Sequence, residues 1–178
     1  SSMSDAPGTM IIEETSDMEE ITVRGAALTK DLAKVTMRNV PDQPGVAAGI
    51  FHELAAGGVV VDDIIQNVSS EGATDLSFTV AVSDLPATVE TGERLVKELG
   101  AKELLTDDHV SKVSVVGVGM RTHTGVAEKM FEALAEAKVN IQMITTSEIK
   151  ISCIIDRDVA DDALRVVHDA FEFDEAGD

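Results

Sequence analysis

The sequence has no tryptophan, no tyrosine and a single cysteine, and only 14 of its 178 residues are Lys or Arg against 33 Asp or Glu. The resulting net charge of −19 excludes nucleic-acid binding as a function, because that binding needs a basic surface that displaces counterions from phosphates. It argues equally against recognition of an anionic membrane surface. The lone Cys153 cannot form an internal disulfide, which fits a reducing compartment.

Long hydrophobic runs are missing too. No apolar stretch approaches the roughly 18 residues of a membrane helix, and the longest candidate, residues 110–120, is interrupted by Ser, Lys and Gly. The first residues lack the basic segment and apolar run of a secretory signal. We therefore expect a cytoplasmic protein, with residues 1–20 as a linker and residues 174–178 as a frayed tail. At 44% hydrophobic residues the chain can still bury a core.

The motifs of common catalytic and cofactor sites are absent as well. There is no GxxxxGK[ST] phosphate loop, and Gly117, Val118 and Gly119 lack the third glycine of a dinucleotide fingerprint. None of the four histidines lies at metal-ligand spacing from another histidine or the cysteine. No serine has the flanking glycines of a nucleophile elbow. We expect no metal, no cofactor and no catalytic residue in this chain.

What the sequence does contain is an internal repeat. Residues 34–67 resemble residues 112–147, with a constant offset of 80 from Gly45 onward. Between Gly45 and Ile64, 8 of 20 positions are identical to their counterparts, where chance gives about one or two. The identical pairs are Gly45/Gly125, Val46/Val126, Ala47/Ala127, Phe51/Phe131, Leu54/Leu134, Ala55/Ala135, Val59/Val139 and Ile64/Ile144.

Each copy predicts the same succession of elements. A strand (35–40 and 113–118) leads through a glycine-containing loop to a helix that has apolar residues at helical spacing. A β-branched strand (59–68 and 139–146), a second strand (76–82 and 149–155) and a second helix (87–99 and 159–171) follow. With a last strand near 102–106, the order is βαββαβ, the ferredoxin-like arrangement of an α+β fold.

The second copy lacks a last strand of its own, because only EFDEAGD remains after Phe171. The strand-like segment 21–28 (ITVRGAAL) is otherwise unassigned, so we predict that it completes the second sheet. The first domain, residues 34–107, is then inserted within the second, which comprises residues 21–33 and 108–173.

The two junctions between first strand and helix are the most informative candidates for a ligand site. They read VPDQPGVAA (40–48) and GMRTHTGVA (119–127). A helix N-terminus offers free N–H groups and a positive dipole end to a carboxylate, and small residues let a ligand approach the backbone. An ordinary helix start, with Asp42 as cap and Pro44 in the first turn, explains the first junction equally well.

The strands that follow these helices end in polar residues, DDIIQN (62–67) and TTSE (145–148). Polar side chains near the junctions can bind an ammonium or hydroxyl group of a ligand. Hairpin turns with solvated side chains are the alternative interpretation.

Taken together, these stretches resemble the ACT-domain regulatory region of aspartokinases. The resemblance rests on VPDQPGVAAGIF, VDDIIQNVSS, KVSVVGVGM, GVAEKMFEAL, VNIQMITTSEIKISCII and the connector DAPGTMI, which span nearly the whole chain. It implies two ferredoxin-like ACT domains in tandem, with residues 1–20 as the linker from a kinase domain.

The same resemblance implies a function. Aspartokinases transfer the γ-phosphate of ATP to aspartate at the start of lysine, threonine and methionine biosynthesis. This chain has no counterpart of the kinase domain, so we expect no catalysis by it alone and a need for ATP and magnesium only in that domain. The implied partners are threonine and/or lysine as feedback effectors, a second copy paired through the ACT domains, and the catalytic domain or large subunit.

Binding residues carry over by motif. In the family, the first ACT domain of one chain typically packs beside the second ACT domain of its partner. One effector site would use Asp42, Gly45, Val46, Ala47, Ala48, Gln66, Asn140 and Ile141. A pseudo-equivalent site would use Met120, Thr124, Gly125, Val126, Ala127, Val60 and Val61. A stretch that serves inhibition and kinase contact corresponds to Thr145, Thr146, Ser147 and Glu148.

Two residues depart from the family pattern. Asp63 stands where an apolar residue is usual, which predicts extra charge near a site and favours a cationic effector. Thr124 stands where proline is common, which predicts a looser second loop. A ligand-independent ACT dimerisation scaffold is the alternative function, and catalysis within this chain is a third.

Overall fold

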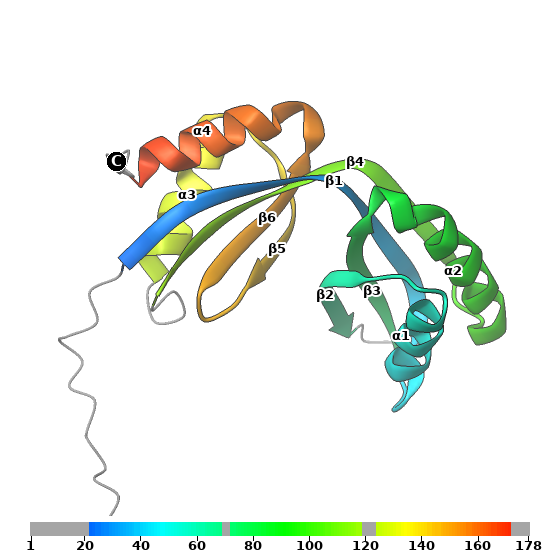
Figure 1. The fold of residues 1–178 in the computed structure, drawn as a ribbon. Helices are drawn as coiled ribbons and strands as arrows, with labels where there is room; N and C mark the ends of the chain where they lie inside the picture. Colours follow the sequence, from blue (N-terminus) through cyan, green and yellow to red (C-terminus); the bar gives the residue numbers. More distant parts are fainter. Residues whose placement is uncertain (1–21, 69–71, 119–123, 172–178) are drawn as a thin grey trace, which may run out of the picture.

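The computed structural model describes residues 22–68, 72–118 and 124–171. Its strands join in one antiparallel sheet of order β2-β3-β1-β4-β6-β5 (Figure 1). The elements are β1 (Thr22–Pro41), α1 (Val46–Ala56), β2 (Val61–Val68), β3 (Ala73–Ala81), the short 3-10 helix η1 (Val82–Asp84), α2 (Leu85–Leu99), β4 (Glu103–Val118), α3 (Thr124–Glu136), β5 (Ile141–Thr146), β6 (Lys150–Asp156), η2 (Arg157–Val159) and α4 (Ala160–Ala170).

Two long strands, β1 and β4, run through both halves of the molecule (Figure 1). The prediction of separate strands at 21–28 and 35–40 was wrong in this respect, because β1 is continuous. Its register against β4 shifts between Thr29 and Lys34, and Asp31 has a φ of 59°. Such bulges bend a strand and increase its twist without breaking it. The two halves are therefore parts of one curled sheet.

Each half nevertheless has the ferredoxin-like strand order. In the first half, β2, β3, the end of β1 and the start of β4 are neighbours in that order. In the second half, residues 22–29 of β1 pair with residues 112–118 of β4, and β6 and β5 follow. The N-terminal segment thus supplies the strand that the second copy lacks. The predicted tandem ferredoxin-like fold, completed from the N-terminal side, is confirmed.

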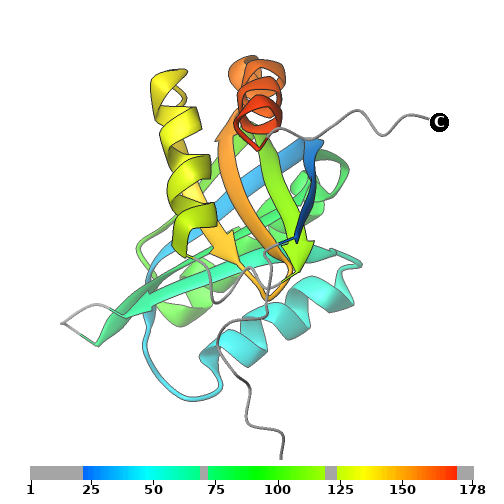
Figure 2. The same cartoon turned by 90° about the vertical axis from the view of Figure 1, so that its left-hand side faces the viewer.

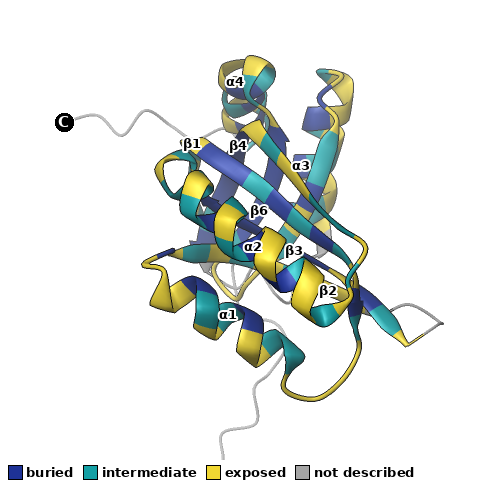
Figure 3. Cartoon of the chain, turned by 90° about the vertical axis from the view of Figure 1, so that its right-hand side faces the viewer, coloured by how far each residue is buried: buried dark blue, intermediate teal, exposed yellow. Residues whose placement is uncertain are grey.

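Each half buries its own apolar core between the sheet and a pair of helices. Val35, Met37, Ile50, Leu54 and Phe78 are among the buried residues of the first half. In the second half, Met130, Leu134, Cys153, Ile155 and Val167 are among them. Figure 2 shows α3 and α4 side by side over the second half, and Figure 3 shows the exposed outer faces of α1 and α2. The helical spacing of apolar residues in the sequence predicted the buried faces of α1 and α3.

The repeat extends to the ends of the first helices. Gly58, with a φ of 77°, donates to the carbonyl of Ala55, and Val59 donates to that of Leu54. In the second copy Lys138, with a φ of 57°, and Val139 donate to the carbonyls of Ala135 and Leu134. A left-handed residue after a helix is usually glycine. Lys138 takes the same conformation although its side chain makes that conformation less favourable.

The face of the sheet that carries no helices is concave, because the sheet curls around it (Figure 1). It carries polar pairs: Thr36 and Ser77 hydrogen-bond at 2.9 Å, and Ser114 and Ser152 at 2.8 Å. The curl brings the opposite edge strands β2 and β5 together, since Thr145 of β5 donates a hydrogen bond to Asp63 of β2. In the part of the chain that the structure describes, no helix has the length and apolar content to cross a membrane.

The contribution of the N-terminal strand can be tested with adjacent alanines. Ala26 packs against the second core and pairs with buried Val115, whereas Ala27 is exposed. We expect Ala26→Asp to reduce the free energy of unfolding by about 2 kcal/mol, because a carboxylate is placed against apolar side chains. Ala27→Asp should change it by less than about 0.5 kcal/mol. Urea denaturation measures both, and equal effects would contradict the assigned packing.

Candidate functional site

The pocket of interest lies where β1 ends and α1 begins. It has a volume of about 370 Å³ and opens between the loop after Pro41, the first turn of α1 and the neighbouring strands β2 and β3. Buried Val40, Ile50 and Leu76 form its apolar part, and Asp42, Gln43, Gln66 and Thr74 contribute polar groups. A concave site with an apolar floor and a few polar groups is typical of small-molecule binding.

The helix that borders the pocket begins at an uncapped end. The residue before α1 is Gly45, in the left-handed region with a φ of 92°, and no side chain caps the N-terminus of this helix. The interpretation of Asp42 as its cap was therefore wrong. The N–H of Asp42 instead donates to the carbonyl of Gly72 at 3.0 Å, which ties the loop to the turn before β3. N–H groups at the start of an uncapped helix, with its positive dipole end, suit a carboxylate.

Five of the eight residues predicted for the first effector site line this pocket. They are Asp42, Gly45, Val46, Ala47 and Gln66. Ala48 is exposed one position further along α1, outside the lining. Ile141 is the first residue of β5, the strand at the other edge of the sheet, and Asn140 directly precedes it; neither lines the pocket.

The structure adds pocket residues that the motif comparison missed. Thr74 and Leu76 come from β3, and Val40 is the second-to-last residue of β1. Thr74 is buried and donates to the carbonyl of Asn67, so it fastens β3 to the end of β2 beside Gln66. The sequence predicted a strand at 76–82, but only the pairing of β2 with β3 brings Thr74 and Leu76 to the loop.

Comparisons with known proteins agree with this architecture. The sequence model of the ACT-domain family matches residues 113–171. The regulatory subunit of aspartate kinase from Thermus thermophilus, in its ligand-free form, is 42% identical and superposes with a TM-score of 0.78 over 84% of this chain and 98% of that one. The chain belongs to the regulatory region of the aspartokinase family.

Two further relatives define how much of an aspartokinase is present. A crystal structure of aspartokinase alpha and beta subunits contains a chain that is 48% identical, with a TM-score of 0.78 over 85% of this chain and 99% of that one. The aspartate kinase of Pseudomonas fluorescens is 47% identical over 174 residues, which are 97% of this chain and 42% of the relative. The chain thus spans about two fifths of the length of that curated relative.

The second predicted site of this aspartokinase region is built differently from the first. Helix α3 already begins at Thr124, so Gly125 is helical and exposed, whereas Gly45 precedes its helix. Val126 is buried in the second core and Ala127 packs against it. Val60 is exposed and Val61 packs against the first core. Met120 lies outside the described residues.

The polar residues within segment 62–67 of β2 have two different roles. Gln66 lines the pocket, whereas Asp62 and Asp63 bind the ammonium of Lys112, each with an oxygen at 2.6 Å from its Nζ. The charge that Asp63 was expected to add near a site is thus paired with Lys112, and the preference for a cationic effector stays a prediction. The hydrogen bond from Lys112 holds the pKa of Asp62 below its ordinary value. Burial alone would lower the pKa of Lys112, but its bonds to Asp62 and Asp63 raise it above the ordinary value.

The stretch predicted to act in regulation comprises the last two residues of β5 and the turn that follows it. Thr145 is half-buried and bonds to Asp63, while Thr146, Ser147 and Glu148 are exposed. The N–H of Ser147 donates to the carbonyl of Lys150 at 2.7 Å, which closes the turn to β6. Cys153, on β6, is fully buried, and burial raises the pKa of its thiol to about 12, so it is unreactive.

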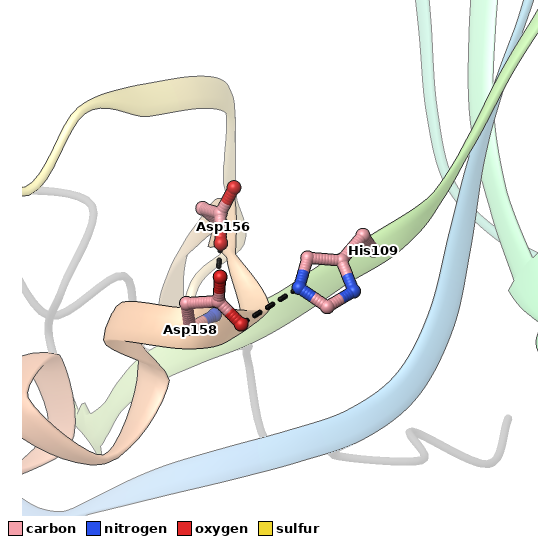
Figure 4. A group of neighbouring side chains, drawn as sticks. All are labelled: His109, Asp156 and Asp158. Atoms are coloured by element: carbon pink, nitrogen blue, oxygen red, sulfur yellow. Dashed lines mark hydrogen bonds and ion pairs between the residues drawn. The ribbon is translucent and has the colours of Figure 1, made fainter.

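Within the described residues, His109, Asp156 and Asp158 form a group of side chains that could ligate an ion, with ligand atoms within 4.8 Å of one another (Figure 4). All three are exposed. Asp156 accepts the N–H of Asp158 as the cap of η2, and Asp158 Oδ1 lies 2.8 Å from His109 Nε2. We interpret the group as a capped helix start with a surface ion pair.

The left-handed backbone at Gly45 predicts opposite effects of alanine at the two equivalent glycines. Gly45→Ala should lower the free energy of unfolding by about 1–2 kcal/mol, because a side chain disfavours that conformation. Gly125 is helical with open space around it, so Gly125→Ala should be neutral or stabilising by up to about 0.5 kcal/mol. Thermal and urea denaturation measure both variants. Destabilisation by both would show that the two loops share one conformation.

The ion pair of His109 predicts a pH dependence. The hydrogen bond and charge of Asp158 raise the pKa of His109 above its ordinary 6.5. The stabilisation is therefore complete below pH 6.5 and is lost as the pH rises through the folded-state pKa. NMR titration of the imidazole should give a lower pKa in Asp158→Asn. Asp161→Asn, which removes a carboxylate paired with Lys30, serves as the control and should leave it unchanged.

Proposed function

We propose that this chain is the allosteric regulatory part of an aspartokinase, which binds threonine and/or lysine and mediates feedback inhibition of aspartate phosphorylation in lysine, threonine and methionine biosynthesis. The observation that carries the proposal is the pocket beside Gly45. It combines an uncapped helix N-terminus, an exposed amide at Gln66 and an apolar floor. The predicted residues Asp42, Val46 and Ala47 line it as well.

The chemistry of the pocket suits a free α-amino acid. Its α-carboxylate would bind at the start of α1, where the backbone N–H groups and the helix dipole favour an anion. Exposed Asp42 and Gln66 offer acceptors for the α-ammonium and a hydrogen-bond partner for a side-chain hydroxyl. A site of about 370 Å³ holds an amino acid of the size of threonine or lysine.

A second copy of the chain completes the site in this proposal. Asn140 and Ile141 lie away from the pocket of their own chain, so the partner's β5 would supply them. Both edge strands expose apolar side chains at equivalent repeat positions, Ile64 on β2 and Ile144 on β5. Edge strands of this kind favour pairing with another chain. The homodimer would thus form through the ACT domains and enclose the effector.

Inhibition then follows from linkage. The effector binds one arrangement of the paired ACT domains more tightly and shifts the attached kinase toward an inactive state. A coupling free energy of about 1–3 kcal/mol is ordinary for such systems. Catalysis, with ATP and magnesium, belongs to the kinase domain or large subunit, and residues 145–148 would contact it. This chain itself needs no cofactor.

Known relatives support the choice of effector. Escherichia coli aspartokinase III has been solved in complex with lysine and aspartate in a T-state; at 21% identity and a TM-score of 0.62 it shares the fold with this chain. Lysine is therefore a candidate beside threonine. The exposed Ile64 and Ile144 also favour the second candidate function, a dimerisation scaffold that binds no effector.

Calorimetry with threonine, lysine and both together tests the proposal directly. We expect binding below about 1 mM to the intact chain. Gln66→Ala and Asn140→Ala should each weaken it about tenfold, since each removes about one hydrogen bond to the ligand. Asn67→Ala is the matched control for Gln66→Ala, because Asn67 is the exposed neighbour on β2 that does not line the pocket.

The outcomes separate the two candidates. Absence of binding by either amino acid, with dimers that form equally well without them, would favour the scaffold. If wild type and Gln66→Ala bind the amino acid with equal affinity, the assignment of the binding site to this pocket is contradicted.

A further inference from the structure

A buried charged network joins the two halves on the concave face. The ammonium of Lys112, on β4, lies 2.6 Å from Oδ2 of Asp62 and 2.6 Å from Oδ2 of Asp63, both on β2. The side chains of Lys112 and Asp63 are each only 6% exposed, whereas that of Asp62 is 62% exposed. Asp63 is therefore the buried counter-charge, and Asp62 is a partner at the rim.

Asp63 also reaches the second half. Its Oδ1 accepts a hydrogen bond from Thr145 Oγ1, on β5, at 2.9 Å, and its Oδ2 lies 3.4 Å from Thr79 Oγ1, on β3. One carboxylate thus connects β2 with β3 of its own half, with the shared strand β4 and with β5 of the other half. Beside it, Lys34 of β1 donates to Gln142 of β5.

The surroundings make these bonds strong. Leu32, Val110, Met143 and Ile154 form a small apolar cluster between the halves, and Ile65 packs against it. The side chains of Lys112 and Asp63 are themselves largely shielded from water, and charge interactions are stronger where the local dielectric constant is low. Breaking one bond of Asp63 there leaves a buried polar group without compensation.

The backbone of β2 is shaped to present Asp63. The register of β2 against β3 shifts between Asp62 and Ile65, and Asp63 has a φ of 46°. A bulge of this kind redirects a side chain, and a left-handed conformation outside glycine persists only where its surroundings enforce it. The N–H of Asp63 is held by Oδ1 of Asp62 at 2.9 Å. The bulge in β2 therefore lies at Asp63, the residue whose side chain accepts the hydrogen bond from Thr145 of β5.

The position of Asp63 links two functional parts. Gln66, which lines the effector pocket, is three residues further along β2, and Thr145 begins the stretch 145–148. We propose that the contact of Asp63 with Thr145, held in place by Lys112, couples the effector pocket of the first half to residues 145–148 of the second. This inference rests on the proposed function for its purpose, but the contact itself is testable without an effector.

Coupling is reciprocal, so a change at Thr145 must alter the stability of the strand β2 that borders the pocket. Thr145→Val removes only the hydroxyl and keeps the shape of the side chain. Amide hydrogen exchange in the full chain, without ligand, should then show about tenfold faster exchange across residues 65–67 of β2, as expected for one lost buried hydrogen bond. Thr146→Val is the matched control, because Thr146 is the exposed neighbour, and should leave these amides unchanged.

A double-variant comparison identifies Asp63 as the connecting residue. Asp63→Asn keeps the size of the side chain and tolerates a left-handed backbone. In that background Thr145→Val should produce much less additional change at residues 65–67. Thr145→Ser keeps the hydroxyl and should behave as wild type. Equal responses to Thr145→Val and Thr146→Val, or to Thr145→Val and Thr145→Ser, would overturn the inference.

An effector arm distinguishes this inference from the proposed function. Threonine or lysine should slow exchange at residues 145–148 in wild type and not in Asp63→Asn, although both bind the amino acid. If neither amino acid binds wild type, the proposed function fails, while the ligand-free result still decides whether Asp63 connects the halves. If the amino acid binds and residues 145–148 respond equally in both proteins, the coupling role of Asp63 is overturned.

Discussion

The pairing of β1 with β4 is the constraint on which the rest of the structure depends. Both strands extend through the whole molecule, and each contributes one part to either half. A four-stranded ferredoxin-like sheet in each half exists only because these two strands are long enough to be shared. The bulges between Thr29 and Lys34 then set the bend between the halves. Neither half can rotate freely, since that would break main-chain bonds of the same ladder.

The bend also decides which residues meet. Strands β2 and β5 are the two ends of the sheet order, as far apart as the topology allows. The curl places them together, and Asp63, Thr145 and Lys112 form bonds that cross between the halves. Burying an ion pair is not stabilising by itself, because desolvation of both charges offsets their attraction. Its value is specificity: the bonds of Asp63 to Thr145 and to Lys112 are made together at this angle between the halves.

Duplication supplied two similar halves, but they are no longer equivalent. The loop before α1 ends in a left-handed Gly45 and opens onto a pocket, whereas α3 begins before Gly125 and buries Val126 in the core. At position 63 the first half has an aspartate, where the second has Met143 in the apolar cluster between the halves. The first half thus holds the open pocket and the crossing carboxylate, and the second half supplies the receiving threonine.

The sequence by itself determined the repeat, the ferredoxin-like order, the helix faces and five of the pocket residues. The first three follow from local properties, such as the spacing of Ile50 and Leu54 and the β-branched composition of the strands. The five pocket residues follow from the resemblance of the sequence to its family. Only the tertiary structure decided that β1 and β4 are continuous, that Thr74 and Leu76 line the pocket, and that Asp63 is neutralised by Lys112. Those features depend on strand register and on sheet curvature. Curvature is the sum of small twists over many residues, so neither property can be read from any single position of the sequence.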